Sequence, residues 1–172
     1  MLAGGQMRRC YQIGVGYCLI LLLAACANTT ALEPQNQPLD TSQARLHFIR
    51  QPAILSTLGS ADIKIDGKLV GSLAADSYIV ADRPPGPHRI TVYGPMNTAG
   101  FEADIQIEPR VSYYFELGPI VQRNIDLFKL DIMRITGRPI PGRYGANSTY
   151  MFYSLDATAG AASVARLKAQ KS

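Results

Sequence analysis

The stretch FEADIQIEPRVSYYFEL, residues 101–117, indicates most clearly how this chain folds. From Phe101 to Ile107 every second residue is apolar, and the residues between them are acidic or amide side chains. After the turn residues 108–110, alternate apolar residues return from Val111 to Leu117. Alternation with a period of two places one face of a strand in a core and the other in water. The stretch therefore predicts a two-stranded hairpin.

A second hairpin is expected between residues 63 and 73. Ile63 and Ile65 alternate with charged residues, and the pair Asp66-Gly67 follows them. A type I′ turn needs positive φ at both central residues, which Asp-Gly supplies. Downstream, the sequence RPPGPH at residues 83–88 should end a strand, because its three prolines lack a backbone donor.

Further strands are predicted at residues 45–49, 78–81, 90–92 and 150–155. Residues 120–135 fit either a helical stripe or a strand, and the density of β-branched residues favours a strand. Residues 136–145 are expected to form a loop. Seven or eight short strands separated by turns predict an all-β sandwich spanning residues 44–155.

The two flanks of this domain have little apolar pattern. Residues 26–43 are polar and carry two prolines, so we expect a flexible linker with an end-to-end distance of roughly 20 to 25 Å. Residues 156–172 are rich in alanine and fit either a short helix or a disordered tail. Neither flank shows a clear apolar face.

Composition excludes several classes of function. The 172 residues include 17 Lys and Arg and 13 Asp and Glu; without Arg8 and Arg9 of the leader, the net charge falls from +4 to +2. A weak, dispersed excess of this kind does not indicate a nucleic-acid partner. All three cysteines lie within the first 26 residues, so the folded part has no internal disulfide and no thiolate metal site.

The N-terminal residues indicate a secretion leader. Arg8 and Arg9 form a positive start, and the 13 residues from Tyr11 to Leu23 form an apolar stretch. A membrane-spanning helix needs roughly 20 apolar residues, so this run is too short to be one. Because Met7 directly precedes the two arginines, we expect translation to begin there. Residues 1–25 of the sequence are therefore predicted to be a signal peptide whose expected first residue is Met7.

Leu23, Ala24, Ala25 and Cys26 resemble the bacterial lipobox, the recognition sequence of the lipoprotein signal peptidase. The resemblance implies cleavage before Cys26 and attachment of acyl chains to its thiol and its new amine. The alternative is an ordinary secretory cleavage site with a chance cysteine. Ala27 is not the aspartate that retains many lipoproteins at the inner membrane, so the rule for this class implies the outer membrane.

Residues 63–92, IKIDGKLVGSLAADSYIVADRPPGPHRITV, resemble PEGA domains and a related lipoprotein domain family of unknown function. The matching positions are Asp66, Gly67, Gly71, Pro85, Gly86, His88, Ile90 and Val92. With Tyr113–Leu117 added, the resemblance covers most of residues 45–135. It implies a small Ig-like or prealbumin-like sandwich whose structural turns contain Asp66, Gly67, Gly71, Pro85 and Gly86. The Pro-Glu-Gly-Ala signature itself is absent, which favours the neighbouring lipoprotein family.

No combination of residues clearly predicts catalysis, a metal or a cofactor. Ser77, His88 and Asp82 are the nearest to a catalytic triad, but no nucleophile elbow surrounds any serine, and His88 is interpreted as a turn residue. Asp62, Asp66 and Asp76 are conceivable calcium ligands, although solvated strand carboxylates are the favoured interpretation. We therefore expect a protein that is not an enzyme.

Two surfaces are candidates for binding. Glu102, Asp104 and Glu108 form an acidic strand face, interpreted as edge protection rather than docking. The aromatic residues Tyr144, Tyr150, Phe152 and Tyr153 are suited to stacking on sugars, but Tyr150 and Phe152 alternate like core residues, with Tyr153 facing out. The sequence thus predicts a membrane-anchored envelope lipoprotein that contacts another envelope protein or the cell wall. A glycan-binding or peptidoglycan-binding module is the alternative, and a hydrolase is a third hypothesis.

Overall fold

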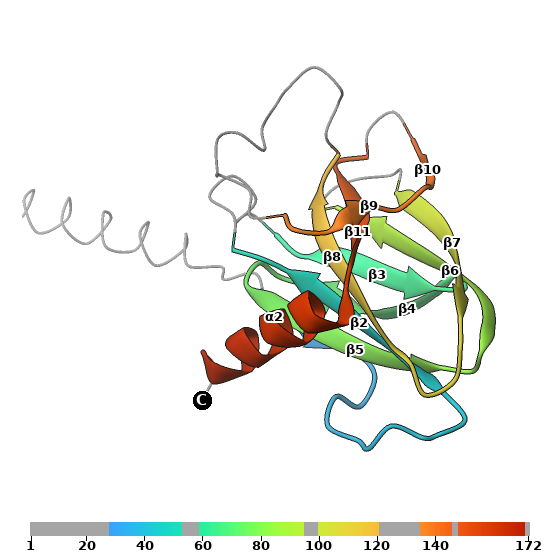
Figure 1. The fold of residues 1–172 in the computed structure, drawn as a ribbon. Coiled ribbons are helices and arrows are strands. Elements are labelled where there is room, and N and C mark those ends of the chain that lie inside the picture. Colours follow the sequence, from blue (N-terminus) through green and yellow to red (C-terminus); the bar gives the residue numbers. More distant parts are fainter. Residues whose placement is uncertain (1–27, 53–58, 95–99, 121–134, 146–147, 171–172) are drawn as a thin grey trace, which may run out of the picture.

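The computed structural model describes residues 28–52, 59–94, 100–120, 135–145 and 148–170, and they form a sandwich of two β-sheets with one helix (Figure 1). The first sheet has six strands in the order β1 (Thr30–Ala31), β4 (Lys68–Leu73), β3 (Ala61–Ile65), β6 (Gly86–Tyr93), β7 (Phe101–Ile107), β10 (Arg143–Tyr144). The second has five, in the order β5 (Ser77–Arg83), β2 (Ala44–Arg50), β8 (Ser112–Pro119), β11 (Tyr150–Leu155), β9 (Arg138–Pro139). The predicted all-β sandwich is confirmed.

The alternating apolar residues of both sheets meet in one core. Phe48, Phe115 and Phe152 form an aromatic cluster at its centre, with ring centroids 5.6 to 6.3 Å apart. Ile63, Ile90 and Phe101 are among the residues of the facing sheet that pack in the same core. The described strand pairs are antiparallel except β2 and β8, which run parallel. The predicted hairpin of residues 101–117 is β7 and β8, but these strands lie in different sheets, so the turn connects the two layers.

The turn chemistry read from the sequence is present. Asp66 and Gly67 have φ of 52° and 80°, as a type I′ turn between β3 and β4 requires. Pro84 and Pro85 separate β5 from β6, and Gly86 begins β6 with φ of 134°. Gly71 departs from the expectation, because it lies inside β4 rather than in a turn. A Cβ there would lie 2.4 Å from the Thr30 carbonyl oxygen, so glycine is what lets β1 approach β4.

The segment predicted to be a flexible linker is part of the fold from residue 28 onward. Thr30 and Ala31 form β1 against Ser72 and Gly71 of β4. Further along, the Gln35 amide bonds both backbone groups of Val80 in β5, at 2.7 and 2.9 Å. The expectation failed because these bonds join a polar segment to sheet edges and require no apolar periodicity.

The alanine-rich end forms helix α2 (Ala157–Ala169), one of its two predicted states. The Asp156 carboxylate caps it by accepting from the Ala159 N–H at 2.8 Å. The helix packs on the outer face of the five-stranded sheet, where Val164 and Leu167 join Ile49 and Leu155 in a second core (Figure 1). Gly160 lies directly against the Tyr114 ring, where any Cβ would clash. A small residue, rather than an apolar stripe, makes this contact close.

Two expectations concern segments that the structure covers only in part or not at all. Most of the strand expected at residues 120–135 lies outside the described residues, as do the leader and Leu23, Ala24, Ala25 and Cys26. The loop expected at residues 136–145 contains the two-residue strands β9 and β10. Eight described strands have five or more residues, in line with the expected seven or eight, and β1, β9 and β10 are additional.

Candidate functional site

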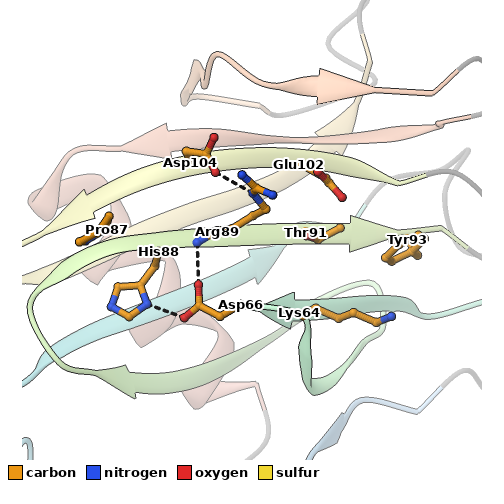
Figure 2. Close-up of a pocket in the computed structure, with 10 residues that line it drawn as sticks. Lys64, Asp66, Pro87, His88, Arg89, Thr91, Tyr93, Glu102 and Asp104 are labelled. Atoms are coloured by element: carbon orange, nitrogen blue, oxygen red, sulfur yellow. Dashed lines mark hydrogen bonds and ion pairs between the residues drawn. The ribbon is translucent and has the colours of Figure 1, made fainter.

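A hollow of about 580 Å³ lies on the outer face of the six-stranded sheet (Figure 2). Strand alternation builds it: in β6 the inward residues Ile90 and Val92 are buried, and Arg89, Thr91 and Tyr93 point the other way. In register, Thr91 pairs with Lys64 of β3 on one side and with Glu102 of β7 on the other. Three neighbouring strands thus contribute side chains to one surface.

Ion pairs cross the floor of this hollow. The Arg89 Nε donates to Asp104 Oδ1 at 2.7 Å, and Arg143 of β10 approaches Asp104 at 3.3 Å and Glu102 at 3.8 Å. The hydrogen bond from Arg89 holds the pKa of Asp104 below its usual value, and burial opposes this effect. The acidic strand face predicted from Glu102 and Asp104 is therefore a mixed surface in which arginines accompany the carboxylates.

One aromatic ring contributes to the hollow. The Lys64 Nζ lies 4.8 Å from the centroid of the Tyr93 ring, within the range of a cation–π interaction. Both side chains are partly exposed. The surface therefore combines an aromatic ring with charges of both signs, a combination suited to a polar partner with charged groups of its own.

His88 and Asp66 connect two turns at one end of the hollow (Figure 2). His88 Nδ1 lies 2.6 Å from Asp66 Oδ2, and Nε2 lies 2.9 Å from the Pro84 carbonyl oxygen. Asp66 Oδ1 accepts from the Arg89 N–H at 2.8 Å. Burial acts to raise the pKa of Asp66, but the bonds from Arg89 and His88 outweigh it and lower that pKa. His88 has contacts that fit the structural role expected of it, but it lies in β6 rather than in a turn.

Through its contacts with Asp66 and with the Pro84 carbonyl oxygen, the His88 ring joins the β3–β4 turn to the β5–β6 connection. Asp66 and His88, which the PEGA resemblance singled out, thus act on each other in space.

The residues considered for a catalytic triad have separate partners. The Ser77 hydroxyl bonds Thr29 and the Ala74 carbonyl, and Asp82 forms a two-point pair with Arg45 at 2.7 and 2.8 Å. His88 is held by Asp66, as described above. In the described part of the chain, no group of three or more His, Cys, Asp or Glu side chains is placed to hold a metal ion.

The aromatic residues considered for sugar stacking divide differently from the prediction. Tyr150 and Phe152 are in the core as expected, and Tyr144 is 61% exposed. Tyr153, expected to face out, is instead buried, and its hydroxyl donates to the Pro119 carbonyl oxygen at 2.6 Å. It lies close to Gly118 and Gly137, so this outer face of the five-stranded sheet is covered. Alternating apolar residues distinguish the two faces of a strand, but in β11 both Phe152 and Tyr153, on opposite faces, are buried.

Sequence reasoning missed Lys64, Tyr93, Arg89 and Arg143, which lie at or beside the hollow. Each is an ordinary outward-facing residue of a strand and belongs to no local motif. These residues can be recognised as neighbours only from the register of β3, β6, β7 and β10. A second, apolar hollow of about 280 Å³ opens between Ile105, Tyr113 and Ile140. It lies where the inward face of β7 is partly exposed.

Among the described residues, no helix has the length and apolar character needed to cross a bilayer. Comparison with protein-family models, with curated proteins and with solved structures found no match to this chain.

Proposed function

We propose that this chain is a bacterial envelope lipoprotein, acylated at Cys26, whose β-sandwich is a binding module and not an enzyme. One observation carries the proposal: Leu23-Ala24-Ala25-Cys26 ends a 13-residue apolar stretch. Three acyl chains hold a protein on a bilayer far more firmly than one, because each buried methylene contributes about 0.8 kcal/mol. With Ala27 after the cysteine, the proposed location is the outer membrane, facing the periplasm.

The proposed binding surface is the hollow on the six-stranded sheet. Its side chains come from the rigid strands β3, β6 and β7, so they are held in position before a partner arrives. Its charges of both signs and its partly exposed Tyr93–Lys64 pair fit another envelope protein or the cell wall. A binding role is also supported by the separate partners of Ser77, Asp82 and His88, because these three residues do not form a nucleophile–base pair with one another.

The anchor is tested by Cys26→Ser in the producing cell. We expect loss of labelling by radioactive palmitate and release of the protein from the membrane fraction. Cys18→Ser is a matched control, because it alters a cysteine of the leader and leaves the lipobox intact. Membrane retention of Cys26→Ser equal to that of the control would contradict the proposal.

A glycan-binding function is the second candidate, and the exposure of Tyr144 favours it. Tyr144 lies in the edge strand β10, beside Arg143, which reaches the carboxylates of the hollow. Tyr144→Ala should then abolish retention on purified peptidoglycan, and Tyr144→Phe, which keeps the ring, should retain it. Equal binding by both variants would exclude Tyr144 from a sugar site. Crosslinking in cells followed by mass spectrometry would then identify a protein partner.

A further inference from the structure

The N-terminal segment, residues 28–37, docks first along β4. Its strand β1 places Thr30 opposite Ser72 and Ala31 opposite Gly71, and the Leu32 N–H donates to the Val70 carbonyl at 3.0 Å. Just before β1, the Thr29 hydroxyl accepts from the Ala74 N–H at 2.9 Å, and the Asn28 carbonyl accepts from the Ser60 hydroxyl at 3.2 Å. The segment is thus tied to the sandwich from its first described residue.

The same segment then crosses to the other sheet. Glu33 forms a two-point ion pair with Arg83 of β5 at 2.7 and 2.9 Å, and Gln35 bonds the backbone of Val80 in the same strand. The Gln37 carbonyl accepts from Arg45 of β2 at 2.9 Å. Contacts with β4, β5 and β2 distribute the attachment over both layers, so the segment has little freedom to act as a tether.

The start of the segment lies at one end of the sandwich. Asn28 contacts Ser60, just before β3 begins, and Thr29 contacts Ser77, where β5 begins. The Asp66-Gly67 turn closes the opposite end of β3. At about 3.3 Å per residue, the strand between Ser60 and that turn separates the two ends by about 20 Å.

Only Ala27 separates Cys26 from Asn28. A fully extended chain spans at most about 3.6 Å per residue, so the Cα atom of Cys26 lies within about 7 Å of that of Asn28. Acyl chains on Cys26 would therefore bring this end of the domain to the bilayer surface. The free linker of roughly 20 to 25 Å expected from the sequence would have allowed any orientation.

We propose, on the basis of the proposed acylation of Cys26, that one end of the sandwich contacts the lipid headgroups. This end is the one around Asn28, Ser60 and residues 74–76, which connect β4 to β5. The Asp66-Gly67 turn and its end of the hollow then face away from the membrane. The charges described near the contacting end are of both signs: Asp62 is exposed, Asp76 is paired with Arg166 at 3.4 Å, and the last turn of α2 adds Lys168.

Single-cysteine probes test this orientation in the whole acylated protein. The mature chain has no cysteine besides Cys26, so Ser60→Cys and Lys68→Cys each provide one free thiol for a small fluorophore. Lys68 is exposed beside the Asp66-Gly67 turn. Each labelled protein is reconstituted in vesicles of phosphatidylethanolamine and phosphatidylglycerol that carry a headgroup-attached quencher. We expect the probe at residue 60 to be quenched severalfold more than the probe at residue 68.

An insertion provides the matched control. Ten Gly and Ser residues placed between Ala27 and Asn28 leave the docked segment intact but separate the anchor from the domain, so the difference in quenching should largely disappear. Equal quenching at residues 60 and 68 in the uninserted protein, with the protein floating on the vesicles, would overturn the fixed orientation and leave the anchor standing. Failure to float would instead overturn the acylation on which the inference rests.

Discussion

His47 should make the stability of this fold depend on pH. It lies on the outer face of β2, stacked on the Tyr114 ring at a centroid distance of 4.6 Å and an interplanar angle of 14°. Its Nδ1 is buried and has no hydrogen-bond partner among the described residues. Burial, with the nearby charges of Arg45 and Lys168, lowers the pKa of His47 from 6.5 to about 4, and the Asp82 charge only partly opposes this.

The sign and size of the effect follow from this shift in pKa. A histidine whose pKa is lower in the fold takes up its proton first in the unfolded state, so acid favours unfolding. Between pH 6.5 and 4, the full shift lowers the free energy of unfolding by about 3 kcal/mol, at 1.36 kcal/mol per pKa unit. At pH 5 the histidine is nearly all protonated in the unfolded state and mostly neutral in the fold. The free energy of unfolding is therefore about 2 kcal/mol lower than at pH 7.

The assay is urea denaturation at pH 7 and pH 5 of the natural protein and of His47→Phe. Phenylalanine keeps a planar ring against Tyr114 but binds no proton, so the variant retains every other pH effect. We expect the free energy of unfolding of the natural protein to fall by about 2 kcal/mol more than that of the variant. Equal falls in the two proteins would refute the reasoning that His47 is neutral in the fold.

Three other features of the fold are tested by substitution. Gly71→Ala places a Cβ 2.4 Å from the Thr30 carbonyl oxygen, so it should cost about 1 to 3 kcal/mol and speed hydrogen exchange of residues 30–32. Gly67→Ala is strained by φ of 80°, but its Cβ meets nothing within 4 Å, so it should not speed the exchange of residues 30–32 selectively. Burial raises the pKa of Glu116, so the folded state is more stable when this side chain is protonated, and that stability is lost as pH rises. Glutamine carries no charge at any pH. Glu116→Gln should therefore raise the urea midpoint at pH 8 but not at pH 4. The buried Arg50 donates to the Gly59 and Leu73 carbonyls and to the Tyr150 hydroxyl, so Arg50→Met should cost about 2 to 4 kcal/mol in urea unfolding, and a midpoint equal to that of the natural protein would contradict this role.

The sequence predicted those parts of the fold whose chemistry is local. The Asp66-Gly67 turn could be placed because positive φ at two successive positions is a requirement of those two residues alone. Strand β7 could be placed because one of its faces is buried and the other is largely in contact with water. Strand β8 could be placed from its alternating apolar residues, although Glu116 on its second face is buried as well. Assigning them to different sheets needed the partners of each strand, which the pattern does not contain.

The failures have physical causes in particular residues. Gly71 was assigned to a turn from the resemblance to PEGA domains, whereas its role is to admit the backbone of β1. Tyr153 was expected in water because its neighbour Phe152 faces the core, but the second face of that strand is covered as well. The groups in the hollow come from strands distant in sequence, so no spacing rule unites Lys64, Arg89 and Asp104.

The sheet edges narrow the ways in which a partner can bind. A long exposed edge strand invites pairing with another chain, and short edge strands prevent it. Among the described residues, β1, β9 and β10 are two-residue edge strands, and the remaining edge, β5, is met by Gln35 and Glu33 of the N-terminal segment.

The outer face of the five-stranded sheet is also occupied, because α2 packs on it through Val164 and Leu167. The outer face of the six-stranded sheet is the described sheet face that carries the open hollow of charged side chains. A partner that cannot add a strand must recognise side chains, and this face presents them on three adjacent strands. Edge protection and the placement of α2 therefore favour the same binding surface as the geometry of the hollow, independently of the charges that line it.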